Sequence, residues 1–285
     1  MHSSIYMLEK ELIEHKVVTR LPLFLLACGV LIFVSLLMNS NLQSNFFYQV
    51  EYSGDISGFE QGFSASLDVF IASAAGFLSV ILTSLYLPKT LRKERQEGSS
   101  MFWRSMPVSH AQTHSVKLAF GLLVIPAICS VLVFGADIML WLLSITSDNQ
   151  LTLLGEQHSI FSAVVNWLVF LLRMILVALA LLPLACVALM VSQLVSSPIL
   201  VMVLAAYTIK WLCVYLFGFH GVSEFFSAVY MLPIMVFSSN PFQGFIGAGF
   251  FNLIIYYVLG AIALTLSLKL SQTNEVSFKG FFAKG

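Results

Sequence analysis

The sequence predicts an all-α integral membrane protein, built as a single domain over residues 1–285 with six transmembrane helices. Hydrophobic residues make up 59% of the chain and charged residues only 10%, and a soluble domain of this size could not bury so much apolar surface. Six apolar runs are each long enough to cross the about 30 Å of hydrocarbon in a bilayer. The basic residues, finally, gather on alternate connections between these runs.

The six predicted spans are long runs with almost no charge. They cover residues 21–38, 67–87, 116–145, 164–191, 199–219 and 245–268. A further apolar stretch at 225–237 spans only 13 residues and contains Pro233. It is too short to cross, so we expect a re-entrant segment within the extracytoplasmic connection 220–244.

Residues 1–20 mix apolar and charged side chains, as in Leu8, Lys10, Leu12 and Glu14. This pattern predicts an amphipathic surface helix before the first span.

The distribution of lysine and arginine indicates the orientation. Twelve of the 14 lie in the leader, in the connection 88–115 with Lys117 just beyond it, or in the C-terminal tail. The three other connections, 39–66, 146–163 and 220–244, contain none. Because positively charged loops stay in the cytoplasm, both termini and the connection 88–115 are predicted to be cytoplasmic.

The stretch 91–109 is the most unusual loop in the chain, because large apolar side chains lie beside basic ones. The apolar ones are Met101, Phe102, Trp103 and Met106. Gly98 and Pro107 limit any helix between them to about two turns, too short to be stable alone in water. Two interpretations stay open: a helix on the bilayer surface with aromatic anchors, or a helix that docks into a groove of a soluble partner.

Two local patterns concern helix ends and packing. Ser109 and Gln112 form a capping-box pattern, so the helix of the third span is predicted to begin early and to run for about 35 residues. Ala72 and Gly76 lie four apart on one face of the second span, which predicts close helix packing there.

No catalytic or metal site is expected, and the chain is not predicted to be an enzyme. It lacks a Walker A motif, an H-E-x-x-H motif and a Gly-x-Ser-x-Gly motif. His110 and His114 lie four apart but have no third ligand in sequence reach. The four cysteines, all within apolar runs, are predicted to pack in the core. With zero net charge, nothing favours nucleic acid as a partner.

Three charged residues fall well inside predicted spans, away from their ends: Asp137, Arg173 and Lys210. Such charges are costly and usually pair or face a cavity. Asp137 and Arg173 are expected at similar depth, either as an ion pair that fixes helix register or as contacts to a substrate. Lys210 either snorkels, pairs with Asp137, or faces a cavity for an anionic group.

The central loop resembles a known signature. It contains Glu94-Arg95-x-Glu97-Gly98-Ser99, then Ser105-Met106-Pro107-Val108-Ser109, and then Lys117. This series resembles the E-R-x-x-G-T…L-P-V-S-R…K signature of ABC-2-type permeases, the membrane subunits of one class of ATP-driven exporters. It departs from that signature at Ser99, where Thr is usual, and at His110, where Arg is common.

The resemblance implies a function for the loop. Residues 98–106 would form a coupling helix that docks in a separate ATPase subunit. The residues expected to make this coupling are Glu94, Arg95, Glu97, Gly98, Met101, Phe102, Trp103, Arg104, Met106 and Pro107. ATP and Mg²⁺ would bind to the ATPase subunit, and this chain would bind no cofactor.

The resemblance also implies a cellular location, a second permease subunit and a transported substrate. The chain would lie in the bacterial inner membrane, surrounded by lipids, and would pair with a second permease copy or a paralogue. It would export a hydrophobic or amphipathic substrate, such as a lipid, peptide or natural product. The alternative is a membrane assembly protein without transport activity, which recruits a soluble factor through residues 91–109.

The charge distribution makes a direct prediction about topology. A tag at either terminus should be reachable only from the cytoplasm, and a tag beside Asp148 only from outside. Impermeant labelling of intact and opened cells measures this. Labelling of a C-terminal tag in intact cells would contradict the six-span arrangement.

Overall fold

The computed structural model describes residues 3–38, 67–96, 109–146, 159–195, 197–218, 220–238 and 240–272. Within these ranges every regular element is a helix, which confirms the all-α class. Six helices are long and apolar enough to cross a membrane, as predicted: Lys16–Met38, Asp68–Leu91, His110–Leu143, Ile160–Leu194, Pro198–Leu216 and Phe250–Ser271. The protein is therefore a multi-pass membrane protein by length and composition.

Between the helices lie either short connections or ranges outside the described residues. The helices are α1 (Ser3–Glu14), α2 (Lys16–Met38), α4 (Leu67–Gln96), α6 (His110–Ala119), η1 (Phe120–Val124), α7 (Ile125–Thr146), α8 (Ile160–Leu194), α9 (Pro198–Phe217), α10 (Gly221–Met235), α11 (Gln243–Ala248) and α12 (Phe250–Gln272). The segments α6, η1 and α7 are continuous and make one long helix, as expected for the third span.

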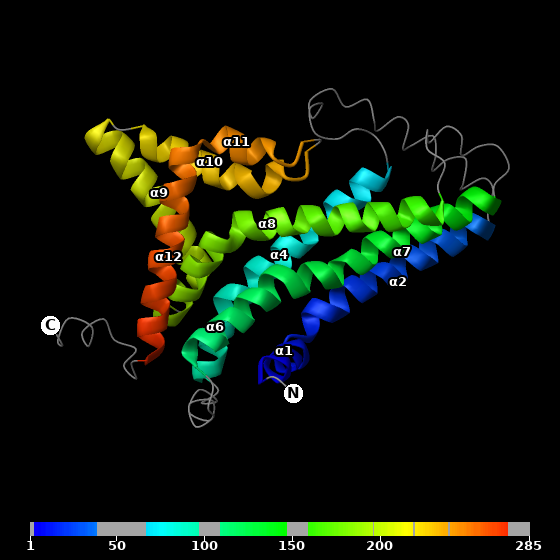
Figure 1. The fold of residues 1–285 in the computed structure, drawn as a ribbon, viewed down its shortest axis with the longest axis horizontal. Helices are drawn as coiled ribbons and strands as arrows, with labels where there is room; N and C mark the ends of the chain where they lie inside the picture. Colours follow the sequence, from blue (N-terminus) through cyan, green and yellow to red (C-terminus); the bar gives the residue numbers. More distant parts are fainter. Residues whose placement is uncertain are drawn as a thin grey trace.

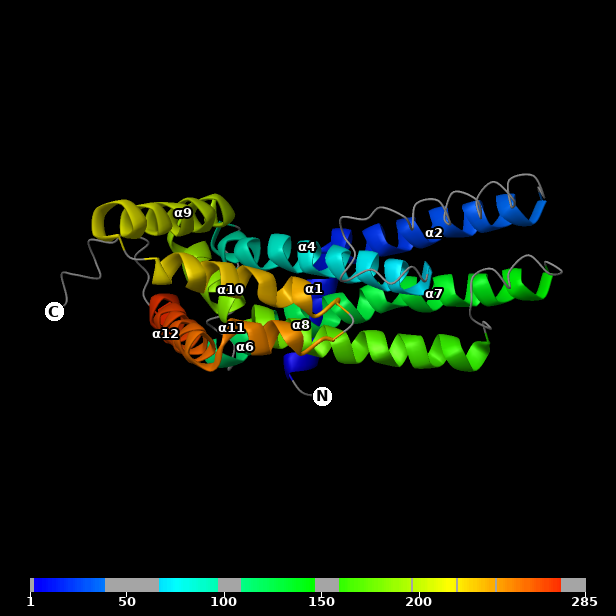
Figure 2. The same ribbon diagram turned by 90° about the horizontal axis from the view of Figure 1, so that it is seen from above.

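Four helices, α2, α4, α7 and α8, run together as an elongated group, and α9 and α12 cross it near one end (Figures 1 and 2). The central member is α8, which packs on α4, α7, α9, α10 and α12. Its buried positions are mostly small, with Ala163, Ala178, Ala180, Ala185 and Ala188 among them. Small side chains let neighbouring helices approach closely, so α8 can contact many of them at once.

The N-terminal segment differs from the expected single surface helix over residues 1–20. The chain changes direction at His15, so α1 ends at Glu14 and residues 16–20 belong to α2. The reason is packing: α1 lies mainly against α6, whereas α2 lies mainly against α7. One helix could not follow both neighbours.

Between α9 and α12, helices α10 and α11 pack against each other (Figure 1). As the short stretch at 225–237 predicted, α10 contains Pro233 and has only 15 residues. Phe237, just after α10, lies against Gly76 of α4, where an added Cβ would overlap its ring. At Gly76 the small-residue face of α4 is therefore packed against an aromatic ring.

Pro126 explains the π-helical segment η1. A proline ring clashes with the carbonyl four residues earlier, and widening the helix by one residue relieves the clash. The Ile125 amide then donates to the Phe120 carbonyl, and Pro126 has no amide hydrogen to offer Gly121. Instead, the Thr83 hydroxyl of α4 donates to the Gly121 carbonyl at 2.7 Å. The proline thus fixes where α4 meets the third span.

Pro183 likewise determines where α8 meets α12. It cannot donate to the Leu179 carbonyl, which accepts from the Tyr257 hydroxyl at 3.1 Å instead. The hydroxyl of Tyr256 donates to the next carbonyl, that of Ala180, at 2.8 Å. One turn later Gly260 lies directly on the proline, because an added Cβ would be 2.6 Å from Pro183 Cα. A proline in one helix, with two tyrosines and a glycine in the other, defines this crossing.

Gly260→Ala should therefore destabilise the protein, since backbone atoms of Pro183 cannot move aside as a flexible side chain would. Overpacking of this kind costs about 1–3 kcal/mol. The matched control is Gly247→Ala on α11, where no atom lies within 4 Å of an added Cβ. Thermal unfolding of both variants in detergent measures the difference, and equal melting temperatures would contradict the close crossing.

Candidate functional site

The side chain of Lys117 is buried, with only 2% of its surface exposed, at the α6 end of the third span. Its Nζ donates to Glu11 Oε1 of α1 at 2.6 Å and to Thr90 Oγ1 of α4 at 2.6 Å. The hydroxyl of Tyr86 donates to the other carboxylate oxygen of Glu11 at 2.7 Å. We call Glu11, Tyr86, Thr90 and Lys117 the Lys117 network; it joins α1, α4 and α6.

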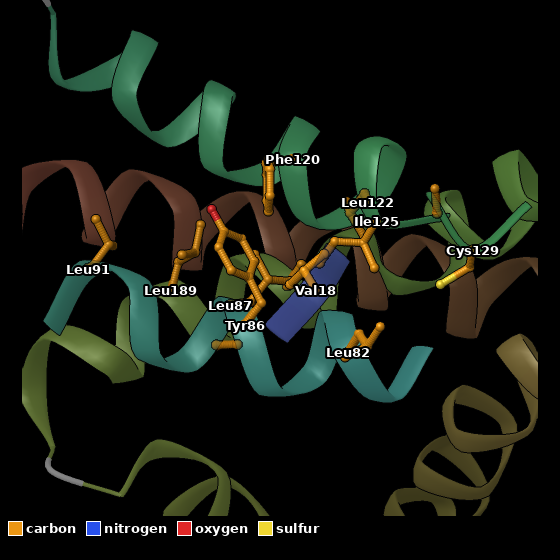
Figure 3. Packing of buried hydrophobic residues seen from close by; sticks show 13 residues of the cluster. Val18, Leu82, Tyr86, Leu87, Leu91, Phe120, Leu122, Ile125, Cys129 and Leu189 are labelled. Atoms are coloured by element: carbon orange, nitrogen blue, oxygen red, sulfur yellow. The ribbon is translucent and has the colours of Figure 1, made fainter. Parts of the chain in front are cut away.

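The arrangement follows from helix geometry. Tyr86 and Thr90 are four residues apart, so both face the same side of α4. The ring of Tyr86 packs against Phe120 at a centroid distance of 4.9 Å, within the apolar cluster of Figure 3. The polar network thus lies directly beside a hydrophobic core, which excludes water from the ion pair.

Burial makes the network sensitive to the loss of any member. Glu11 is 3% exposed and receives a hydrogen bond on each oxygen. His15 lies 3.5 Å from one of those oxygens, so it adds a positive group when protonated. A buried charge that loses its partner keeps its desolvation cost without compensation. The three helices are consequently held in one relative position.

A second polar cluster connects α6 to two further helices. His114, 2% exposed, lies with Nε2 2.9 Å from Ser267 Oγ of α12. Gln193 of α8 donates to the same hydroxyl at 2.7 Å. His114 Nδ1 lies 2.9 Å from the His110 carbonyl, which can only accept, so Nδ1 carries a hydrogen. These contacts tie α6 to α8 and α12.

Both clusters include residues of α6, which follows residues 97–108 in the sequence. Helix α4 leads into that stretch and α6 leads out of it, and Thr90 and Lys117 join the two helices. Ser109 caps α6 as predicted, its Oγ accepting from the Gln112 amide at 3.2 Å. The side-chain amide of Gln112 donates to Ser4 of α1 at 3.0 Å. The helices on either side of the loop are thus bound to each other and to α1.

The predicted coupling residues themselves are not placed. Glu97, Gly98, Met101, Phe102, Trp103, Arg104, Met106 and Pro107 lie outside the described residues. Glu94 and Arg95 fall within α4, and the description does not extend to their side chains. The docking role of this stretch stays a prediction.

The expected ion pair between Asp137 and Arg173 does not form. Trp167 of α8 donates to Ser130 Oγ of α7 at 3.0 Å and its ring lies 5.9 Å from Phe134. This register places Arg173 about 16 Å from the level of Asp137 along the helix axes. Both carboxylate oxygens of Asp137 are buried without a hydrogen-bond partner. Apolar length predicts the span, but side-chain packing sets the register.

The remaining predicted groups are separate from these clusters. Lys210 lies half-buried on α9, whose main contacts are with α4, α8 and α10. Cys129 and Cys186 are buried, as predicted, whereas Cys28 and Cys213 are half-buried; all four are free thiols. No group of three possible metal ligands occurs within the described ranges.

Comparison of the chain with known protein families, curated proteins and solved structures found no match. The likeness to ABC-2-type permeases therefore rests on the loop residues themselves. Sequence reasoning assigned no role to Glu11, Tyr86 or Thr90. The sequence feature that could have indicated the network was Lys117, a lysine at the start of a span, together with Tyr86 and Thr90, which lie four residues apart on another helix.

The network predicts coupled stability effects. Lys117→Met and Glu11→Gln should each cost about 3–5 kcal/mol, because each leaves a buried polar partner unsatisfied, and the double variant should cost less than their sum. Lys89→Met is the control, because Lys89 is an exposed lysine on the same turn of α4 as Thr90. Thermal unfolding of the wild type, the two single variants and the double variant in detergent measures these costs. Strictly additive losses of stability would contradict a direct ion pair between Lys117 and Glu11.

Proposed function

We propose that this chain is the permease subunit of an ABC exporter, driven by a separate ATPase subunit that docks on residues 91–109. The loop residues from Glu94 to Lys117 support this by their resemblance to the ABC-2 signature. Six apolar helices supply the membrane domain. The observation that carries the proposal is the Lys117 network, since it joins the two helices that flank the loop.

The network suits the transmission of force. If α4 and α6 moved independently, a movement of the docked ATPase subunit would only deform the loop between these two helices. Buried hydrogen bonds from Lys117 to Thr90 and Glu11 make α4, α6 and α1 move as one unit. The His114 and Ser267 contact extends that unit to α12. Coupling between distant sites needs such a contiguous physical network.

The continuous helix formed by α6, η1 and α7 then transmits the movement of the loop across the bilayer. It runs without a break from His110 to Thr146, and η1 interrupts its α-helical geometry just after Lys117. Segments of π-helix commonly lie at functional positions in helices. In this proposal η1 is the point at which movement of α6 becomes a tilt of α7.

Several further features belong to the proposal. The ATPase subunit binds ATP and Mg²⁺, while this chain binds neither and pairs with a second permease copy or a paralogue. In the bacterial inner membrane, α1 lies at the cytoplasmic surface and both termini are cytoplasmic. The α10 and α11 pair forms the re-entrant region on the outer side. The cargo is a hydrophobic or amphipathic molecule.

The decisive experiment targets the loop aromatics. Changing Phe102 and Trp103 together to Ala should abolish association with the ATPase subunit while membrane insertion stays normal, because aromatic anchors contribute about 2 kcal/mol or more each. Co-purification in detergent, with mass spectrometry of the soluble chain, measures this. Phe161→Ala, an exposed aromatic at the start of α8, is the control.

Two outcomes would overturn the proposal. Unchanged co-purification of the ATPase subunit with the double variant would remove the docking role. Capture of a soluble chain without ATPase activity, lost in the double variant, would favour the assembly protein that recruits a factor through the same loop.

A further inference from the structure

Ser79 of α4 is a fully buried serine that neither polar cluster uses. Its Oγ has no hydrogen-bond partner among the described residues. Serine hydroxyls in a helix commonly donate to a carbonyl three or four residues earlier, as those of Ser84, Ser130 and Ser192 do. The hydroxyl of Ser79 makes no such bond, so it is available to a group beyond its own helix.

The thiol of Cys129 on α7 lies close to Ser79 but is a poor partner for it. The two side chains do not reach hydrogen-bond geometry, and a thiol is only a weak donor and a weak acceptor. A buried hydroxyl without a partner destabilises the folded protein. A stronger partner than the thiol would remove this cost.

A cavity of about 10 Å³ lies beside Ser79, where α4, the third span and α8 meet. Its lining includes Ser79 and Thr83 of α4, Leu122 and Pro126 of the third span, and Met174 of α8. All five of these residues are buried. One water molecule needs about 10–15 Å³ of such space. The cavity is therefore suited to a single water molecule and to nothing larger.

Two of the lining residues carry acceptors that can receive a further hydrogen bond. The Thr83 hydroxyl donates to the Gly121 carbonyl at 2.7 Å, and its oxygen can still accept. The Leu122 carbonyl lies four residues before Pro126, which has no amide hydrogen to donate to it. Because Leu122 and Pro126 both line the cavity, the cavity lies at this missing hydrogen bond.

We propose that one ordered water molecule binds in this cavity and links α4 to the third span. The water accepts from the Ser79 hydroxyl and donates to Thr83 Oγ1 and to the Leu122 carbonyl. These are three hydrogen bonds, the usual number for a buried water. The site thus satisfies a hydroxyl of one helix and a carbonyl of another with the same molecule.

The water lies beside η1, and this position has a consequence for movement. Helices often bend where a water molecule enters their ladder of hydrogen bonds. A water can exchange partners as a helix tilts, whereas a bare carbonyl in an apolar medium is costly. This suits η1 as the point at which α7 tilts. That consequence rests on the proposed function; the binding of the water does not.

The first test is an experimental structure of the purified chain, without any ATPase subunit, at a resolution that shows ordered water. We expect one density peak about 2.8 Å from Ser79 Oγ, Thr83 Oγ1 and the Leu122 oxygen. An empty cavity would overturn the proposal. So would a Ser79 hydroxyl that bonds to the Cys129 thiol or to a carbonyl of its own helix.

Ser79→Ala gives a second test, because a bound and an unbound hydroxyl predict opposite results. If the hydroxyl binds water, its removal loses a hydrogen bond and lowers the melting temperature in detergent by about 2–4 °C. If the hydroxyl is unpartnered, its removal leaves the melting temperature unchanged or raises it, and the proposal fails. Ser84→Ala is the matched control, since Ser84 is an exposed serine on α4 that donates to the Ile81 carbonyl of the same helix.

Radiolytic labelling tests the site without high-resolution density. A short X-ray pulse splits water where it lies, and the hydroxyl radical oxidises a neighbouring side chain. Met174 lines the cavity and is only 3% exposed, so its oxidation in the wild type requires a water inside the protein. Ser79→Val fills the cavity with methyl groups and should lower the rate of Met174 oxidation about threefold or more.

The buried thiol of Cys186 on α8 is the internal control for this labelling. It is not part of the cavity lining, so its rate of oxidation should be the same in both proteins if the variant is folded. Equal rates of Met174 oxidation in the wild type and in Ser79→Val would contradict the bound water. Because no ATPase subunit is present in these assays, failure here leaves the docking experiment on Phe102 and Trp103 unaffected.

Discussion

The position of the helices at one end of this molecule depends on the buried ammonium group of Lys117. An ammonium group without water needs acceptors and a counter-charge. Glu11 supplies the charge and Thr90 a second acceptor, each at 2.6 Å. These groups come from two other helices, so satisfying one side chain sets α1, α4 and α6 relative to one another. The helices flanking residues 97–108 are thereby joined.

The same requirement, that buried polar groups find partners, also shapes the middle of the bundle. Two prolines each leave a helix carbonyl without its usual donor, and a neighbouring helix supplies a hydroxyl in each case. Thr83 serves Gly121, and Tyr257 serves Leu179. In an apolar medium an unsatisfied carbonyl costs several kcal/mol. The prolines therefore determine which helices meet and at which residue, rather than simply weakening the helices that contain them.

Asp137 is an exception to this pattern, because both of its carboxylate oxygens lack a hydrogen-bond partner. Its oxygens are buried and unpartnered, whereas Lys117, Glu11 and His114 all have partners within the protein. The first set of contacts joins the helices on either side of residues 97–108. Among the described residues, no hydrogen bond reaches the carboxylate of Asp137, farther along the same continuous helix.

The sequence by itself determined the spans, the helix start at Ser109 and the short helix with Pro233. These depend on local properties, namely apolar length and capping chemistry. Only the tertiary structure decided the partners. Glu11 and Lys117 are 106 positions apart, and Asp137 misses Arg173 because the packing of Trp167 sets the register. Hydrophobicity specifies how deep a helix lies, but rotation and sliding between helices depend on side-chain contacts that no single segment encodes.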